Sequence, residues 1–280
     1  MQPMIRELET NQYVKVSSLL ASFGYCLAVE SIITGLTKPR IFVDDAASPK
    51  SAFTWFKGRA WVAGEANNAQ FNRALRVLLA KTYYRELATR EAQVFILHYT
   101  TNWEPQTKAI LGSHPRTRSL RHYYHLDATR QTRDVIVPDD FELHLINTSL
   151  LAEAGLENLS EVVDEMQPER LSIEDFLQKS FGYCVVHGKE IVGWCTSEYN
   201  TAQRCEPGIA TVERYRKMGI ATLTATVVIK HVQAHGITDI GWHCWADNKP
   251  SIATAQKLGF TKKCEYPVYM VSLEAEQTGS

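Results

Sequence analysis

The sequence lacks the cysteine and histidine patterns of a metal site. Its six cysteines are scattered without a C-x-x-C pair, and its nine histidines include no H-E-x-x-H spacing. We therefore expect no bound metal. Scattered cysteines in a chain of this size indicate reduced thiols rather than a disulfide framework, so a cytoplasmic protein is expected.

Long hydrophobic runs are also absent. No stretch approaches the ~20 apolar residues that a membrane-spanning helix needs, and residues 1–7 contain no apolar signal-peptide core. Neither charge sign dominates, since 30 lysines and arginines face 31 aspartates and glutamates. This balance argues against a membrane or a nucleic acid as the main partner.

What the chain does have is the composition of an ordinary globular protein, with 45% hydrophobic and 22% charged residues. Its 280 residues predict two domains. The polar, charge-rich stretch 127–134 is the best boundary. We therefore expect an N-terminal domain over residues 1–133 and a C-terminal domain over residues 134–280.

Hydrophobic periodicity predicts alternating helices and strands in both halves. In the first half, strands are expected over 25–34, 40–45, 93–99 and 118–126 and as a pair within 51–63, with helices over 12–22, 67–88 and 103–111. In the second half, strands are expected over 141–146, 205–212, 240–245 and 268–273 and as a hairpin over 182–195, with helices over 149–154, 159–166, 172–179, 219–234 and 250–258. The fold class is α/β (α+β), with a mixed, mostly antiparallel sheet flanked by helices.

The first motif that carries chemistry lies where an apolar strand meets a helix, in residues 208–222. The first amides of a helix have no intrahelical acceptor and lie at the positive end of its dipole. Gly219 and Ala221 let a large anion approach those amides, and Arg214, Arg216 and Lys217 add positive charge. This segment predicts a pyrophosphate cradle without a Walker lysine.

A second motif follows about thirty residues later. Asn248 is placed to cap the helix over 250–258, with Pro250 in its first turn. The helix ends in Lys257-Leu258-Gly259-Phe260. Capping alone would explain Asn248 and Ser251, but N-x-x-S-x-x-x-A-x-K-L-G-F after R-x-x-G-x-A is a specific combination.

Together these segments resemble the acetyl-CoA-binding core of the GNAT superfamily of N-acetyltransferases over roughly residues 140–273. Residues 40–45 and 49–55 also resemble the first half of a two-domain subfamily, whose members include a zwittermicin A acetyltransferase. That resemblance implies a degenerate GNAT-like α/β domain in the first half, where no R-x-x-G-x-G/A motif occurs before residue 130.

The resemblance also implies where acetyl-CoA binds. The strands over 205–212 and 240–245 should splay apart, with the pantetheine arm between them near Ala210 and Val212. The Val212 amide is the implied oxyanion donor, and the amides from Met218 to Thr222 should hold the pyrophosphate. The full set of expected cofactor contacts is Ala210, Thr211, Val212, Arg216, Lys217, Met218, Gly219, Ile220, Ala221, Thr222, Asn248 and Ser251.

Attack of an amine on a thioester needs a base. Glu206 is the first candidate, because many relatives hold a carboxylate near the start of the splayed strand. His243 is the second, because imidazole titrates near neutral pH, and Glu198 is the third. Ala255 stands where many relatives have a tyrosine that protonates the departing thiolate. Its substitute is Tyr266, Tyr269, Ser251 or solvent.

The leading functional hypothesis is transfer of an acetyl group from acetyl-CoA to a small-molecule amine by a monomer or homodimer. An acyl-CoA-binding sensor without catalysis and a protein lysine or N-terminal acetyltransferase are the alternatives. Several aromatic residues are candidates for an acceptor pocket, although most are expected in the core: Trp55, Trp61, Tyr83, Tyr84, Trp103, Tyr123 and Tyr124.

Overall fold

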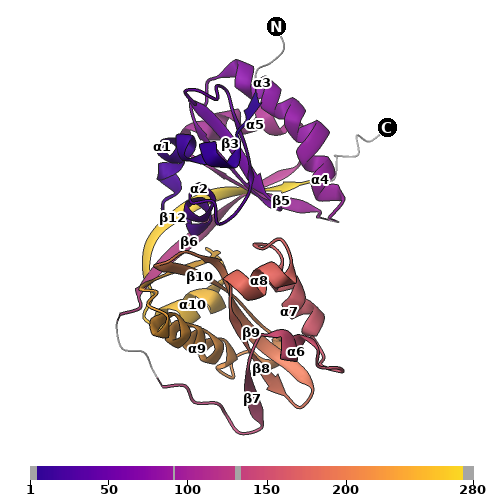
Figure 1. Cartoon of the computed structure of the whole chain (residues 1–280), viewed down its shortest axis with the longest axis vertical. Helices are drawn as coiled ribbons and strands as arrows, with labels where there is room; N and C mark the ends of the chain where they lie inside the picture. The colour runs from indigo at the N-terminus through magenta and orange to yellow at the C-terminus, as the bar shows by residue number, and fades with distance from the viewer. Residues whose placement is uncertain (1–4, 91, 130–133, 274–280) are drawn as a thin grey trace. The chain divides into compact units, whose positions relative to one another are not determined.

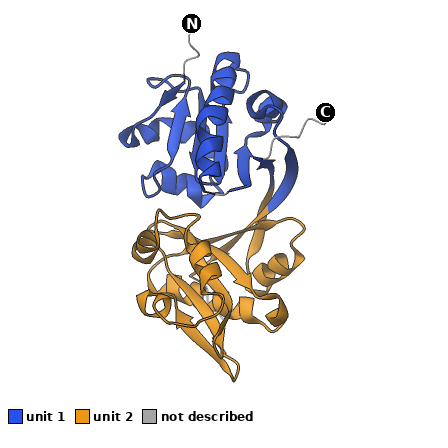
Figure 2. Cartoon of the chain, turned by 90° about the vertical axis from the view of Figure 1, so that its right-hand side faces the viewer, with its two compact units in different colours: residues 1–121, 266–280 blue, residues 122–265 orange. Residues whose placement is uncertain are grey.

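The computed structural model of the chain describes residues 5–90, 92–129 and 134–273, which form two compact units (Figure 2). Unit 1 comprises Met1–Arg121 with Tyr266–Ser280, and unit 2 comprises His122–Glu265. This division differs from the expected one at 133/134 because strands β6 (Arg116–Asp127) and β12 (Thr261–Ser272) each run from one unit into the other. The expected boundary residues 130–133 lie outside the described residues.

Unit 1 contains strands from an antiparallel meander and one parallel pair. Its strand order is β1-β2-β3-β4-β5-β12, and only β4 and β5 pair in parallel among the pairings described there. The strands are β1 (Arg6–Glu7), β2 (Arg40–Val43), β3 (Ser51–Phe56), β4 (Arg59–Gly64) and β5 (Val94–Tyr99). The helical segments are η1 (Thr10–Val16), α1 (Ser17–Leu20), η2 (Ala21–Phe23), α2 (Leu27–Ile33), α3 (Ala69–Leu78), η3 (Leu79–Tyr83), α4 (Tyr84–Ala88), η4 (Thr101–Gln106) and α5 (Thr107–Leu111).

The predicted strand over residues 25–34 is wrong, because this segment is helix α2. Six of its ten residues are buried, four of them in the unbroken run 26–29, so its hydrophobicity shows neither a clear helical nor a clear strand period. The signal for a helix was Gly35, which follows it with a φ of 75° and closes its C-terminus. The remaining predicted elements of unit 1 are present, with shifted ends and some 3-10 turns.

Unit 2 repeats this plan with the strand order β12-β6-β11-β10-β9-β8-β7. Its further strands are β7 (Phe141–Leu145), β8 (Gly182–His187), β9 (Glu190–Asn200), β10 (Arg204–Thr211) and β11 (Asp239–Trp245). Its helical segments are α6 (Thr148–Leu151), α7 (Leu159–Met166), α8 (Ile173–Lys179), η5 (Glu213–Tyr215), α9 (Ile220–Ala234) and α10 (Lys249–Lys257). All the elements predicted here are present.

Helices cover both faces of the unit 2 sheet (Figure 1). On one face α9 and α10 pack over Cys195, Trp242 and their neighbours. On the other, α6, α7 and α8 pack over Cys184, Trp194 and their neighbours. Side chains of a strand alternate between these faces, so each sheet residue can be assigned to the α9 face or the α7 face. In the part of the chain that the structure describes, no helix has the length and hydrophobicity to cross a bilayer.

The two units differ at their parallel strand pairs. In unit 1, β4 and β5 stay paired over four residues, from Arg59↔Ile96 to Val62↔Tyr99. The helix between them, α3, is capped by the Asn68 side chain, which accepts a hydrogen bond from the Phe71 amide. Unit 1 therefore keeps its sheet closed and its helix terminus occupied.

Candidate active site

Strands β10 and β11 of unit 2 separate after only two residue pairs, Arg204↔Asp239 and Cys205↔Ile240. Strand β10 stays paired with β9 as far as Thr211↔Gly193. Its register with β9 shifts between Cys205 and Pro207, which marks a β-bulge. The divergence expected between these strands is present.

Pro207 explains why the strands part at this point. It pairs with Ser197 in the ladder with β9, and the Val212 amide donates to the Val192 carbonyl in the same register, at 2.9 Å. Alternation along an antiparallel ladder therefore turns the backbone of Pro207 toward β11. Proline has no N–H, so the parallel ladder loses its next donor.

The same alternation decides which backbone groups face the gap. Val212 is engaged with β9, so its amide is not available as the oxyanion donor that the resemblance implied. Ala210, two residues earlier, also belongs to the β9 side. The N–H and C=O groups of Ile209 and Thr211 face the gap instead. The Thr211 hydroxyl oxygen is buried without a hydrogen-bond partner on the face of the sheet beside Gly193 of β9, where a Cβ on Gly193 would lie 3.3 Å from it.

Strand β10 ends at Thr211, and after the turn η5 helix α9 begins at Ile220 with an open N-terminus. Its N-cap, Gly219, has a φ of 87° and supplies no side-chain cap, and its first backbone bond is donated by Leu223, at 2.9 Å. The amides of Ile220, Ala221 and Thr222 therefore have no intrahelical acceptor. A Cβ on Gly219 would meet nothing within 4 Å, so the terminus is open to a ligand.

The basic residues before the helix differ in how they are used. The Arg214 guanidinium pairs with the buried Glu190 carboxylate, which also accepts a hydrogen bond from the Tyr215 hydroxyl. Arg214 therefore neutralises Glu190 rather than adding free charge. Arg216 is exposed, 3.8 Å from Glu213. Lys217 adopts a φ of 68°, a conformation that favours glycine.

Asn248 and Ser251 have structural partners. The Asn248 side chain accepts a hydrogen bond from the Ser251 amide, at 3.1 Å, and so caps α10. The Ser251 hydroxyl accepts one from the indole N–H of the buried Trp242, at 3.0 Å. A cofactor contact by either side chain stays a prediction.

We expect Asn248→Ala to lower the free energy of unfolding by about 1 kcal/mol, because the Ser251 amide loses its acceptor. Urea denaturation measures this change. Asn248→Asp is the control, since a carboxylate caps equally well. An alanine variant as stable as the wild type would show that the Asn248 cap does not stabilise the fold.

The two first-ranked base candidates form a pair where the strands part. His243 Nε2 lies 3.1 Å from Glu206 Oε1, and both side chains are almost fully buried. The ring of Tyr123, from β6, stacks on the imidazole with centroids 4.8 Å apart. Burial raises the pKa of Tyr123 to about 12, so its hydroxyl is protonated at neutral pH.

Gly241 makes room for this pair. A Cβ there would lie 2.9 Å from Cγ of Glu206 and 3.0 Å from the Tyr123 ring. Gly241 was not among the residues expected at the site. The feature of the sequence that indicates it is a glycine inside a strand, which often marks a place where another group approaches closely.

Comparisons with known proteins now decide the family. The sequence profile of a family described as GNAT acetyltransferase matches residues 18–269. The chain belongs to this family. It is 28% identical over 271 residues to an uncharacterized N-acetyltransferase, YdfB of Bacillus subtilis, covering 95% of this chain and 98% of that protein.

Solved structures show the same fold. A GCN5-related N-acetyltransferase-like protein from Streptococcus suis aligns with a TM-score of 0.68 at 19% identity, covering 93% of this chain and 98% of the other. A tandem GNAT protein from the clavulanic acid biosynthesis pathway, in a structure without AcCoA, aligns with a TM-score of 0.58 at 12% identity, covering 97% and 99%. The resemblance to a two-domain GNAT protein is confirmed.

The protein is therefore a GNAT-type acyltransferase, and acetyl-CoA is the general co-substrate of its family. The residues of this chain fit acetyl-CoA. An open helix terminus with a glycine N-cap follows the strand that leaves its parallel partner, and backbone N–H and C=O groups of that strand face the gap. Unit 1 of this GNAT protein has neither feature at its own parallel pair.

The two tyrosines proposed as general acids lie in unit 1. The Tyr266 ring packs against Tyr25 at an interplanar angle of 39°, with centroids 4.5 Å apart, and stacks on His98, at 6.0 Å. The Tyr269 ring stacks on Tyr99, at 5.0 Å. A proton-donating role for either stays a prediction. Most of the other aromatic candidates are core residues of unit 1, as expected.

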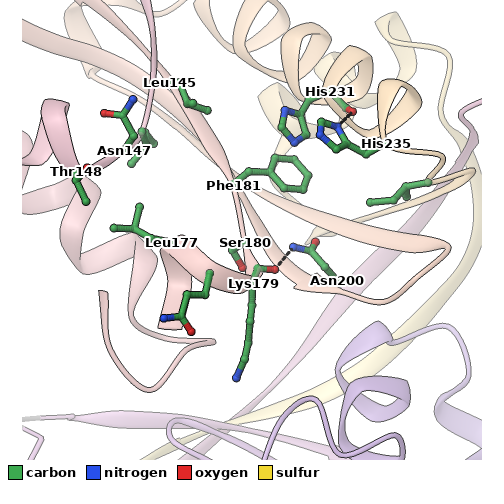
Figure 3. A pocket seen from close by; sticks show the side chains of 13 residues that line it. Leu145, Asn147, Thr148, Leu177, Lys179, Ser180, Phe181, Asn200, His231 and His235 are labelled. Atoms are coloured by element: carbon green, nitrogen blue, oxygen red, sulfur yellow. Dashed lines mark hydrogen bonds between the residues drawn. The ribbon is translucent and has the colours of Figure 1, made fainter. Parts of the chain in front are cut away.

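Away from the strand gap, unit 2 of this GNAT protein has a pocket of about 550 Å³ (Figure 3). It lies between the C-terminal ends of α8 and α9, where the rings of Phe181 and His231 stack at 4.1 Å and His231 stacks on His235. None of the expected catalytic or cofactor residues lines it. The described residues contain no group of three or more His, Cys, Asp or Glu side chains that could hold a metal ion.

Proposed function

We propose that this GNAT protein transfers the acetyl group of acetyl-CoA to a primary amine of a small molecule by direct attack. One observation carries the proposal: the Glu206–His243 pair stands at the point where β10 leaves β11, and β10 leads from there to an open helix terminus. A base and an anion site thus lie at the two ends of one gap.

In this proposal the amides from Met218 to Thr222 bind the pyrophosphate, with Arg216 and Lys217 as its cationic partners. The pantetheine arm runs along β10 against the backbone of Ile209 and Thr211. The Thr211 amide takes the oxyanion role first given to Val212, because it faces the gap.

The amine nitrogen attacks the thioester carbonyl, the new N–C bond forms and the C–S bond breaks. Glu206 accepts the proton that leaves the amine, and His243 fixes the carboxylate through their 3.1 Å contact. The thiolate leaves and takes a proton from solvent, since a thiol pKa of about 8.5 makes it a tolerable leaving group. The Ser251 hydroxyl accepts a hydrogen bond from Trp242 and keeps its own proton, so a proton-donating role for Ser251 stays the alternative to solvent.

The N-terminal unit has another part in this proposal. Its closed strand pair and capped helix support a degenerate GNAT-like domain that binds no CoA of its own. We propose that residues 134–265 of unit 2 carry the whole acetyl-CoA site.

The test is release of free thiol from acetyl-CoA in the presence of a panel of monoamines, diamines, polyamines and aminoglycosides. The proposal expects amine-dependent thiol release and an acetamide product detected by mass spectrometry. Acetyl-CoA binding without thiol release from any amine would favour the sensor hypothesis instead. Turnover with lysine-containing peptides alone would favour a protein acetyltransferase.

A further inference from the structure

Two carboxylates converge on Gly208, two residues after Glu206 on β10. A Cβ on Gly208 would lie 2.8 Å from Oε1 of Glu198 and 2.9 Å from Oε1 of Glu165. Glu198 belongs to β9 and Glu165 to α7, so two separate elements bring their oxygens to one point. Only glycine lets both carboxylate oxygens come this close to the backbone of β10.

Two buried polar groups without partners lie along the same face. The hydroxyl oxygen of Thr196 has no hydrogen-bond partner, and its residue is 1% exposed. Thr196 is the direct cross-strand partner of Gly208, so its side chain stands beside the space between the carboxylates. The indole N–H of Trp194, on the same α7 face, is also without a partner, and that residue is 7% exposed. Buried polar groups are rarely left unsatisfied, so the Thr196 hydroxyl, which can accept a hydrogen bond, points to a ligand that donates one. The indole N–H of Trp194 only donates, so it takes no part in binding a cation.

The methyl group of Thr196 lies on the side that faces β8. A Cβ on Gly182, its partner on β8, would lie 3.0 Å from this methyl. The hydroxyl is the remaining polar branch, and Gly208 leaves the β10 side of Thr196 without a side chain. The hydroxyl, Glu165 and Glu198 therefore place oxygen atoms around one point of the α7 face, beside Gly208.

This cluster of oxygen atoms lies on the same sheet face as the Glu206–His243 pair. Strand geometry separates Glu206 and Gly208 by about 7 Å. A linear diamine of about four or five carbons spans that distance. Oxygen ligands from only two carboxylates and a hydroxyl suit an ammonium group, which donates three hydrogen bonds.

We propose that Glu165, Glu198 and Thr196 form a cation subsite for a second ammonium group of the acceptor, so that the enzyme selects diamines and polyamines over monoamines. This inference rests on the proposed function, because Glu206 would take the proton from the amine that is acetylated. The reaction itself is unchanged, and the subsite only holds the other end of the acceptor.

The experiment compares putrescine with n-butylamine, which has the same carbon chain and one amine fewer. The wild type is expected to show a kcat/KM at least tenfold higher for putrescine, since one charge-assisted hydrogen-bonding site is worth that factor or more. Glu198→Gln and Glu165→Gln should each lower kcat/KM for putrescine at least tenfold. Glu165→Gln should change the value for n-butylamine less than twofold. Glu198 was also the third candidate base, so an equal loss with both amines in Glu198→Gln would assign it that role and overturn its place in the subsite.

Glu161→Gln is the matched control, because Glu161 is an exposed residue one turn earlier on α7. It should leave both substrates unchanged. Gly208→Ala is a second variant, whose Cβ must displace both carboxylate oxygens without removing a charge and should affect putrescine alone. Equal kcat/KM for the two amines in the wild type would overturn the subsite and leave the acetyltransferase proposal standing.

Equilibrium binding separates the two proposals. Putrescine binding to the full chain with CoA present is measured by calorimetry for the wild type and the two glutamine variants. Binding that weakens at least tenfold in both variants supports the subsite even if no amine is acetylated, a result that would sink the proposed function only. Binding that is absent in the wild type, or equal in all three proteins, overturns the subsite.

Discussion

Gly219→Glu is expected to weaken acetyl-CoA binding at least 100-fold. The amides of Ile220, Ala221 and Thr222 have no intrahelical acceptor, and Gly219 leaves their approach open. A glutamate at this position adds bulk and a negative charge where the pyrophosphate is expected. The loss corresponds to about 2.7 kcal/mol of binding free energy and is measured by isothermal titration calorimetry.

The chain offers a matched control at the other end of the same helix. Gly236 follows α9 with a φ of 73°, and a Cβ there meets nothing within 4 Å, as at Gly219. Gly236→Glu therefore introduces the same substitution with the same backbone strain, about 1–2 kcal/mol of stability. It should retain wild-type affinity for acetyl-CoA. If both variants bind equally well, the helix terminus does not hold the pyrophosphate.

Much of unit 2 was predictable because its signals are local. Gly236 and Gly259 end α9 and α10, and both have a positive φ, as their places after the helices suggested. The open terminus at Gly219 also follows from sequence, since no capping side chain is present. When the ends of the helices are known, the hydrophobic runs between them can be assigned to strands with little choice of first residue.

The gap between β10 and β11 was expected only through resemblance, although the sequence contains its cause. Glu206-Pro207-Gly208 places a residue without an N–H inside a strand, and proline inside a strand is confined to edges and bulges. Its register with β9, however, depends on pairing between segments far apart in the chain. The engagement of the Val212 amide could not be predicted without that register.

The carboxylates near Gly208 had a partial signal. In α7, Val162 and Met166 are buried, and Glu165 lies on the same stripe at a spacing of three residues from Val162. A carboxylate on the inward stripe of an amphipathic helix indicates a polar partner in the interior. The partner itself, a space opened by a glycine on another strand, depends on tertiary packing.

Glu206→Gln is expected to lower kcat at least about 100-fold while the dissociation constant for acetyl-CoA stays within twofold. Glutamine keeps the size of the side chain and can still hydrogen-bond to His243, so the buried pair is not left with an unpaired group. It cannot accept the proton that leaves the amine. Steady-state rates with the best amine of the thiol-release panel, together with calorimetry, separate these two effects.

The pH profile of the variant distinguishes a lost base from a damaged fold. Without a base only amine that is already neutral reacts, so the residual rate should rise about tenfold per pH unit up to the pKa of the amine. Glu142→Gln, on the exposed edge strand β7, is the control and should keep the wild-type profile. His243→Asn should cost less, about tenfold, because His243 only fixes the carboxylate. A Glu206→Gln enzyme with full kcat would transfer the role of base to His243, and the asparagine variant would then carry the large loss.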